Sequence, residues 1–359
     1  MNVPPCPAIL SDRFNTLRYD REREAVVLLN RRTYPFTTEY VECRTVEEVA
    51  VAIEDMIVQG GPPLAYAAGL GLALAVRNSA GQSSEAQRSA LDLAGARLLA
   101  TRPTADDLHH IIPSALAAGM TALDKGAPAF DAVLAHVESE IERGNRVSRG
   151  CGEYAAGLLQ DGDRVLTHCI AGAALCWMLW VAKHQGKAIH LYPTETRPYF
   201  QGARLTAQSA REMGVACTLV TDSMPAFLMS RGMLDKFICA ADRVTLDGHI
   251  TNKIGTYQLA IAARHHSLPF YVLGYDGPDL QTETGADIPI EERAPEEVFH
   301  ARGIDPATGA PARIRTAALG IEGYYPAFDI TPPGLITAIA TDRGVFEPGD
   351  VRGYSAEID

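Results

Sequence analysis

Two side chains capable of acid–base chemistry, Cys169 and Asp242, stand near the ends of apolar segments of the sequence. Cys169 is part of "RVLTHCI" (164–170), and Asp242 is part of "KFICAADRVT" (236–245). Two further runs, "AIHLYPT" (188–194) and "ACTLVTD" (216–222), lead into polar groups in the same way. Over the four runs the polar groups are His168 and Cys169, Glu195 and Arg197, Thr221 and Asp222, and Asp242 and Arg243. Because the carboxyl ends of parallel strands share one edge of a sheet, we expect these groups to gather there.

Cys169 stands just before a segment that reads as a helix beginning near Gly172. The partial positive charge at a helix start favours an anion, so we expect the pKa of the thiol to be lowered. The alternative is an inert cysteine in the core, since cysteine is among the most buried residue types. Cys176 and Cys239 lie inside apolar runs, and they fit that alternative.

Asp242 follows the apolar run "FICAA". A carboxyl group at the end of a buried strand is partly desolvated, which raises its pKa and suits proton transfer near neutral pH. The alternatives are an ion pair with Arg243 or a helix N-cap. If Cys169 and Asp242 face one cavity, they form an acid–base pair.

Three segments offer candidate anion sites. "GHITNKIGTYQLA" (248–260) places Asn252 and Lys253 where a helix is expected to open, and a helix start with a lysine suits an anion. The alternative is an ordinary cap with a surface lysine. Arg102 follows a helical stretch, where it is either a partner of the helix C-terminus or a phosphate ligand. The turn "QGGPP" contains Gly60 and Gly61, whose backbone could approach an anion closely.

The elements that position these groups alternate from about residue 160 onward. Short apolar runs, including "PFYVLG" (269–274), are separated by helical stretches. The expected helices are Ala171–Gln185, Ala203–Met213, Met224–Arg231 and Lys253–His266. This alternation is typical of a parallel sheet with helices on both faces.

The first part of the chain has a different pattern. Residues 45–58 are amphipathic at helical spacing, and residues 83–100 begin with a capping serine and place Leu91, Ala94 and Leu98 on one face. A short β-like stretch precedes them at 24–35. We therefore predict an α/β protein with a mainly helical N-terminal domain, residues 1–135, and a Rossmann-like parallel-sheet C-terminal domain, residues 136–359.

Composition limits the function classes. The formal net charge of -12 argues against nucleic acid as a partner, because binding its backbone needs a basic surface. The longest apolar run, Ala171 to Ala182, is too short to cross a membrane, and the first residues do not resemble a signal peptide. The cysteine count is odd, at seven, and no pair has C-x-x-C spacing, so we expect no metal site and no disulfides. We expect a cytoplasmic protein.

Several long segments together resemble the methylthioribose-1-phosphate isomerase family, within the larger group that includes regulatory subunits of the eukaryotic translation initiation exchange factor. The resemblance covers nearly the whole chain. It is densest at "ETRPYFQGARLTA" (195–207), "DRVTLDGHITNKIGTYQLAIAARHHSLPFYV" (242–272), "IPIEERAPEEV" (288–298) and "YYPAFDITPPGLITAIATDRG" (324–344).

The resemblance implies an aldose–ketose isomerase of a furanose 1-phosphate, with Cys169 and Asp242 as the catalytic pair. The implied substrate contacts are Gly60, Gly61, Arg102, Gln201, Asn252 and Lys253. The family's enzymes need no metal or organic cofactor, and they are commonly homodimers. The implied partner is a small sugar phosphate, and the implied setting is methionine salvage. The pair could move a proton between C2 and C1 or assist a hydride shift, and the sequence does not choose.

Two departures from the family pattern leave the substrate open. Gln59 stands where the family has a phosphate-binding arginine, and Ile170 replaces a polar residue after the cysteine. Losing a guanidinium weakens anion binding. Alternative substrates are 5-deoxyribose 1-phosphate and ribose 1,5-bisphosphate. A non-catalytic regulatory or ligand-binding homologue is a further alternative, although a pure binding module has no need of both Cys169 and Asp242.

Overall fold

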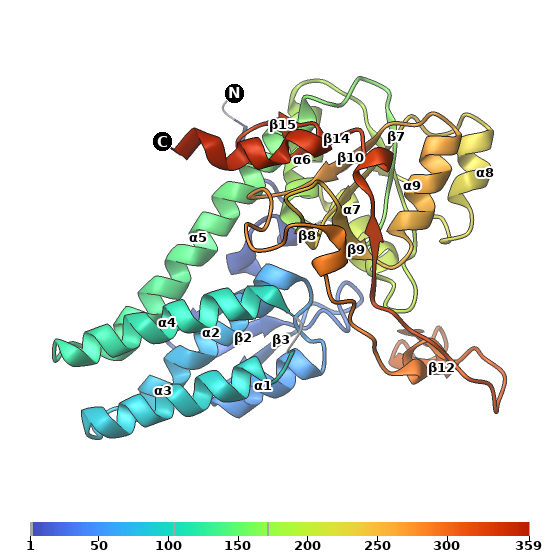
Figure 1. Cartoon of the computed structure of the whole chain (residues 1–359). Helices are drawn as coiled ribbons and strands as arrows, with labels where there is room; N and C mark the ends of the chain where they lie inside the picture. The colour runs from blue at the N-terminus through green and yellow to red at the C-terminus, as the bar shows by residue number, and fades with distance from the viewer. Residues whose placement is uncertain (1–2, 103–104, 171, 359) are drawn as a thin grey trace. The chain divides into compact units, whose positions relative to one another are not determined.

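The computed structural model describes residues 3–102, 105–170 and 172–358, and the chain forms two compact units (Figure 1). The helical unit is Asp12–Asn145, and the sheet unit is Met1–Ser11 together with Arg146–Asp359. The helix α5 (Ala129–Ala156) contributes residues to both. The domain boundary expected at residues 135/136 falls within α5, and it stays a prediction.

The helical unit joins a small antiparallel sheet to a group of helices. Strands β1 (Leu17–Asp20), β2 (Ala25–Leu29) and β3 (Tyr40–Cys43) are followed by α1 (Val46–Glu54), α2 (Gly61–Asn78), α3 (Ser84–Leu99) and α4 (Asp106–Asp124). The Ser83 hydroxyl accepts from the Ala86 amide, and Leu91, Ala94 and Leu98 are buried, as the sequence predicted. Every residue of α2 from Leu64 to Val76 is buried, and most of them are small or apolar. Helix α2 contacts α1, α3 and α4.

The sheet unit is built on a seven-stranded sheet among the described residues, in the order β15-β14-β10-β7-β4-β5-β6. Its strands are β4 (Arg164–Thr167), β5 (His190–Pro193), β6 (Ala216–Cys217), β7 (Lys236–Ala240), β10 (Phe270–Leu273), β14 (Ala338–Ala340) and β15 (Val345–Phe346). All pairings are parallel except that of β14 with β15. From β6 to β14 this is the Rossmann order, so the predicted fold class is confirmed.

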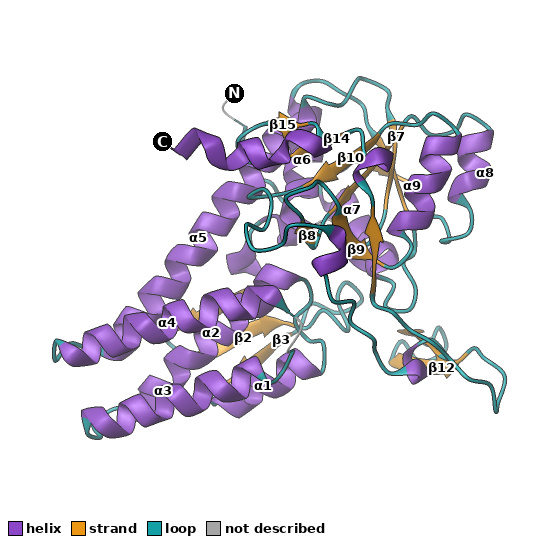
Figure 2. Cartoon of the chain, in the orientation of Figure 1, coloured by secondary structure: helices purple, strands orange, loops and turns teal. Residues whose placement is uncertain are grey.

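The connecting helices lie where the sequence indicated, with one exception. They are α6 (Gly172–His184), a π-helical turn (Gly202–Thr206) continued by α7 (Ala207–Glu212), α8 (Pro225–Ser230) and α9 (Thr256–His265), as Figure 2 shows. Residue 171, the expected first residue of α6, lies outside the described residues. The expectation of a helix opening at Lys253 was wrong, because Lys253 ends a strand.

A second, antiparallel sheet follows the central strand β7. It contains β8 (Arg243–Val244), β9 (Ile250–Lys253) and β13 (Phe328–Thr331), with β9 in the middle. The stretch expected to form one strand at 236–245 is therefore two, with a break at residues 241–242. The strands β11 (His300–Ile304) and β12 (Pro311–Arg315) form a separate hairpin. Short 3-10 helices occur at Ile9–Ser11, Arg13–Asn15, Gly285–Asp287, Pro295–Glu297, Pro333–Leu335 and Pro348–Ile358.

Within the part of the chain that the structure describes, no helix combines the length and the apolar character that crossing a membrane requires.

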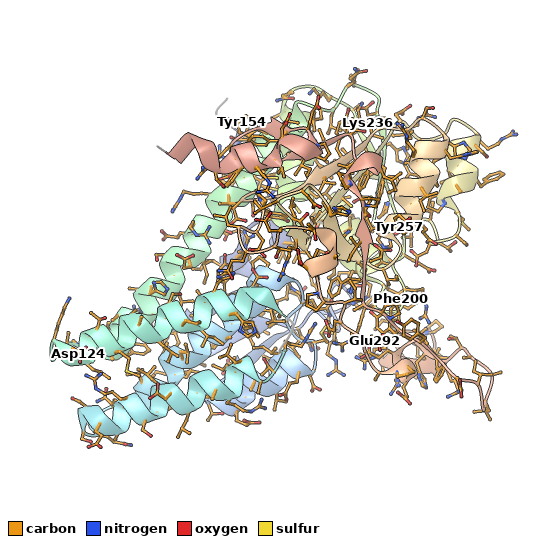
Figure 3. All side chains as sticks on the ribbon, in the orientation of Figure 1. Asp124, Tyr154, Phe200, Lys236, Tyr257 and Glu292 are labelled. Atoms are coloured by element: carbon orange, nitrogen blue, oxygen red, sulfur yellow. The ribbon has the colours of Figure 1, made fainter. Side chains whose placement is uncertain are left out.

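An ion pair joins the amino ends of the two central strands. Lys236, the first residue of β7, donates from Nζ to Oδ2 of Asp163 at 2.5 Å, just before β4 (Lys236 is labelled in Figure 3). The two side chains are only 9% and 8% exposed. Breaking a buried pair leaves one uncompensated charge, which is far more costly than losing a surface pair.

We predict that Lys236→Met lowers the free energy of unfolding by about 3–5 kcal/mol, measured by urea denaturation. Glu153→Ala removes the exposed pair Arg149–Glu153, and it should cost no more than about 1 kcal/mol. The double variant Asp163→Ala/Lys236→Met should recover part of the loss, since it leaves neither charge unpaired. A Lys236→Met protein as stable as the wild type would contradict the buried pair.

Candidate active site

Cys169 and Asp242 lie where the strand order of the parallel sheet reverses. Cys169 follows β4 and Asp242 follows β7, and these two strands are parallel neighbours. The chain builds the sheet outward from β4 in one direction and from β7 in the other. Open α/β sheets bind ligands at this reversal, outside the carboxyl ends of the strands. After loss of solvation, the charge of Asp242 is one of the causes that raise the pKa of the Cys169 thiol.

Two threonines hold the backbone of Cys169 in an unusual conformation. Its φ angle is +64°, a region that non-glycine residues rarely adopt. The Cys169 amide donates to Oγ1 of Thr196 at 2.9 Å, and its carbonyl accepts from Oγ1 of Thr206 at 2.7 Å. Conformations of this kind persist where the surroundings impose them, and they cluster at functional sites.

Burial keeps the Cys169 thiol protonated at neutral pH. The residue is 6% exposed, and loss of solvation is the largest cause raising its pKa to about 12. The charges of Asp242 and Asp222 act in the same direction, whereas Lys253 and the Ile170 amide oppose them. The expectation of a lowered pKa was therefore wrong. Loss of solvation destabilises the thiolate here by more than a helix start and one lysine stabilise it.

Asp242 is exposed, and the expected partial desolvation of its carboxyl group stays a prediction. The buried part of β7 ends at Ala240, and Asp242 lies in the link to β8. Its amide donates to the Thr251 carbonyl at 2.8 Å, which ties this link to β9. Arg243, the expected alternative ion-pair partner, approaches Asp279 and donates to Oγ1 of Thr282.

Lys253 brings a positive charge to the Cys169 side of the site. It is 7% exposed at the end of β9, and its Nζ lies 4.2 Å from the centroid of the Phe328 ring. The surface-lysine alternative is thus wrong. The neighbouring Asn252 is also buried, and its amide nitrogen donates to Oγ1 of Thr256 at 2.9 Å.

A carboxylate of the protein, that of Asp329, binds the backbone amides at the start of α9. The amides of Gly255 and Tyr257 donate to the Asp329 carboxylate at 2.7 and 3.1 Å. These two amides are therefore engaged by Asp329. Binding of an anion by Asn252 and Lys253 stays a prediction. Burial raises the pKa of Asp329 to about 6, although both amides and Lys253 oppose the shift.

Gln201 presents an unpartnered polar atom inside the sheet unit. The residue precedes the π-helical turn and is 5% exposed, and its Oε1 has no hydrogen-bond partner among the described residues. A buried amide oxygen without a partner is unusual in native proteins. This atom is available to a ligand.

The other polar groups expected at the sheet edge are engaged in structural contacts. His168 is neutral, since burial lowers its pKa, and its ring nitrogens contact Oγ1 of Thr194 and the Ile254 carbonyl at 2.6 and 3.0 Å. Arg197 donates to the carbonyls of Val298 and His300. The Asp222 carboxylate accepts from the amides of Thr196 and Arg197. Thr221 contacts Ser223 through its hydroxyl, and burial raises the pKa of Glu195.

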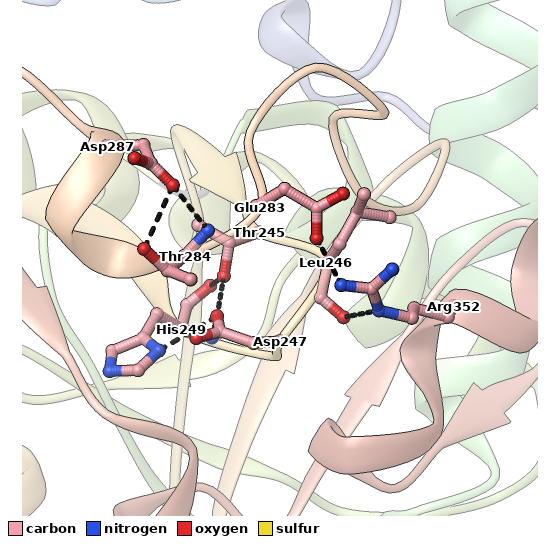
Figure 4. A network of polar contacts seen from close by, with 8 residues as sticks. All are labelled: Thr245, Leu246, Asp247, His249, Glu283, Thr284, Asp287 and Arg352. Atoms are coloured by element: carbon pink, nitrogen blue, oxygen red, sulfur yellow. Dashed lines mark hydrogen bonds and ion pairs between the residues drawn. The ribbon is translucent and has the colours of Figure 1, made fainter.

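A polar network fixes the turn between β8 and β9 (Figure 4). Asp247 accepts at one oxygen from the Thr245 hydroxyl at 2.5 Å and contacts the His249 ring at 2.9 Å. Arg352 donates to the Leu246 carbonyl and pairs with Glu283. This turn lies between Asp242 and Lys253 in the chain, so the network stabilises β8, which follows Asp242, and β9, which ends at Lys253.

The helical unit contains the remaining expected contacts. Gly60, with φ +91°, caps α2, and Gly61 is the first residue of that helix. A side chain on Gly61 would collide with the Asp107 carboxylate. Arg102 is half-buried, and one of its guanidinium nitrogens lies 3.2 Å from the sulfur of Met56.

A buried arginine accompanies the glycine turn despite Gln59. The Arg31 guanidinium donates to the Gln59 carbonyl and lies beside Gly60. Gln59 is 2% exposed, and its Oε1 has no partner among the described residues. Arg31 could not be predicted as a neighbour of this turn, because no local sequence pattern joins the end of β2 to it.

No cluster of three or more histidine, cysteine or acidic side chains suited to a metal ion occurs among the described residues. All seven cysteines are free thiols.

Comparison with known proteins identifies the family. The Initiation factor 2 subunit family matches residues 57–348. The chain belongs to this family. A methylthioribose-1-phosphate isomerase from Chloroflexus aurantiacus is 39% identical over 338 residues, covering 91% of this chain and 94% of that protein. The resemblance drawn from the motifs is confirmed.

Two solved structures share the fold of this family member over almost its whole length. The 5-methylthioribose 1-phosphate isomerase from Pyrococcus horikoshii OT3 gives a TM-score of 0.83 at 32% identity, covering 99% of both chains. The translation initiation factor eIF-2B subunit delta from A. fulgidus gives a TM-score of 0.77 at 36% identity, covering 93% of this chain and 96% of that one.

We predict that iodoacetamide alkylates Cys169 at a rate that rises about tenfold per pH unit from pH 7 to 10, because only the thiolate reacts. Peptide mapping by mass spectrometry measures the rate. A short cysteine peptide, with a pKa of about 8.5, should level off above pH 9. A plateau for Cys169 below pH 9 would contradict the raised pKa.

Proposed function

We propose that this chain converts 5-methylthioribose 1-phosphate into 5-methylthioribulose 1-phosphate, with Cys169 and Asp242 as its acid–base groups. The observation that supports the proposal best is the location of both residues after neighbouring parallel strands, at the reversal of the strand order. The substrate is a small sugar phosphate, and Lys253 supplies a buried positive charge beside the thiol.

The chain is an enzyme of the isomerase class. Its curated relatives carry that name at 39% and 41% identity over 91% and 94% of the chain. The assignment to methionine salvage follows from the same relatives. A homodimer in the cytoplasm remains our expectation.

The reaction opens a furanose ring and moves one hydrogen. The bond between C1 and the ring oxygen breaks, and the ring oxygen takes a proton from the Cys169 thiol. Asp242 accepts the proton of the C2 hydroxyl, and the C2 oxygen becomes the ketone. The hydrogen on C2 moves to C1. Return of the proton from Asp242 to the thiolate restores the enzyme, so no atom or electron is gained or lost.

The raised pKa of Cys169 favours a hydride shift over proton abstraction at C2. Removing a proton from C2 needs a strong base, and a buried thiol that stays protonated is an acid instead. A hydride shift carries the C2 hydrogen to C1 with its electron pair and needs no base at that carbon. Burial of Ala240 and partial burial of Ile170 keep water from the thiol.

The proposed substrate contacts keep the assignment drawn from the resemblance. In the sheet unit they are Gln201, Asn252 and Lys253, and Gln201 offers an amide oxygen without a protein partner. In the helical unit they are Gly60, Gly61 and Arg102. Gln59 offers no charge, but Arg31 supplies a guanidinium at the same turn. The group at C5 of the sugar is the part of the substrate that these residues specify least.

We predict ketose formation from a panel of ribose 1-phosphates with methylthio, hydrogen, hydroxyl or phosphate at C5, the methylthio sugar giving the highest kcat/KM. Cys169→Ser and Asp242→Asn should each lower kcat by about 10²–10⁴-fold without lowering Tm. Cys217→Ser, on the edge strand β6, and Asp350→Asn, on the surface, are the matched controls. If the protein converts none of these sugars, a binding role, as in the initiation-factor subunits, would be favoured instead.

We predict that substrate carrying deuterium at C2 keeps the label at C1 of the product, since a hydride shift has no contact with solvent. Proton NMR of the product in ordinary water measures the retained label. Complete loss of deuterium would contradict the hydride route and would require a base at C2, while leaving the isomerase assignment intact.

A further inference from the structure

Several buried polar atoms of the sheet unit have no hydrogen-bond partner among the described residues. Among its described residues they are side-chain oxygens of Thr167, Gln201, Thr251, Tyr325 and Thr331. Buried polar groups in native proteins nearly always have a hydrogen-bond partner, so each such atom needs an explanation. Tyr325 carries the one phenol of the group and is 3% exposed.

Hydrogen bonds connect the Tyr325 segment to Cys169. The Ala327 carbonyl accepts from the Ile254 amide at 3.1 Å. The Ile254 carbonyl in turn lies 3.0 Å from Nε2 of His168, the residue before Cys169. Next to this hydrogen bond, Phe328 of β13 pairs with Lys253 of β9. Burial is the largest cause that raises the pKa of Tyr325; Tyr199 and Glu297 also raise it, and Cys169 makes a smaller contribution in the same direction.

Other tyrosines of the same unit use their hydroxyl groups within the protein. The Tyr199 hydroxyl donates to Glu297 at 2.7 Å and accepts from Arg293 at 2.9 Å. The Tyr354 hydroxyl donates to Asp342 at 3.0 Å. Tyr325 lies near the Tyr199 network, yet its hydroxyl makes no hydrogen bond to it among the described residues. The backbone of Tyr325 is nevertheless fixed, because its carbonyl accepts from the Arg293 amide at 2.9 Å.

We propose that the Tyr325 hydroxyl donates a hydrogen bond to the ring oxygen of the substrate, beside the Cys169 thiol. This inference rests on the proposed function. The ring oxygen gains negative charge while its bond to C1 breaks, and a fixed donor directed at it acts most strongly in the transition state. Tyr325 is thus a catalytic residue that the chain holds in place through its backbone and leaves unpartnered for the sugar.

Tyr325→Phe removes the hydroxyl and keeps the ring. We expect kcat to fall about 10–100-fold with KM within about threefold of the wild type, since the bond strengthens in the transition state. Tm should stay the same or rise, because the variant loses no protein hydrogen bond. Tyr354→Phe is the matched control, and it should lower Tm and leave kcat/KM unchanged, since its hydroxyl bonds Asp342.

The outcomes separate this inference from the proposed function. If the wild type converts no sugar of the panel, the proposed function fails, and the Tyr325 contact fails with it. If the wild type is active and Tyr325→Phe keeps its kcat, only the Tyr325 contact is overturned. A fall in kcat accompanied by a loss of Tm as large as that of Tyr354→Phe would assign the hydroxyl a structural role and would also overturn the inference.

Discussion

The parallel pairing of β4 with β7 is the constraint on which the rest of the sheet unit depends. These strands lie next to each other although two other strands of the sheet come between them in the chain. The pairing brings the residues after both strands to one edge, and the buried ion pair of Asp163 with Lys236 fixes the opposite ends of the same strands. Any shift in this register would move Cys169 relative to Asp242.

Burial and charge act against each other at this edge. The enclosure that keeps water from Cys169 also removes the solvation a thiolate needs, and one lysine does not compensate for it. This edge therefore holds a neutral thiol and an exposed carboxyl group. In the proposed reaction the two groups exchange a proton, and their unlike surroundings suit the separate roles of acid and base.

Local sequence predicted the elements well where burial is continuous. "KFICA" is buried at every position, and the residues of α3 on one face are buried as their spacing required. The break after Ala240 and the strand that ends at Lys253 were missed, because β8 pairs with β9 and β9 in turn pairs with 328–331, a distant segment. Long-range pairing leaves no trace in local periodicity. The motif resemblance supplied the site residues that spacing alone could not.

Electrostatics were the least predictable part of the site. A helix start after Cys169 is visible in the sequence, but the depth at which the thiol is buried is a property of the whole fold. The surroundings of Arg31 and Tyr325 are likewise properties of the whole fold. Their types are unremarkable in the sequence, and only the folded chain shows one beside a glycine turn and the other without a partner.

The carboxylate that caps α9 gives this protein one group that responds to acid in an uncommon direction. Asp329 has a pKa of about 6 in the folded chain, above the value of about 3.9 for an unfolded aspartate. Between these two values the native chain takes up a proton that the unfolded chain leaves in solution. Mild acidification thus stabilises the fold through this residue, and that contribution is lost as the medium becomes neutral. Most ion-paired carboxylates make a protein acid-sensitive, whereas this one gives a measure of acid tolerance near Lys253.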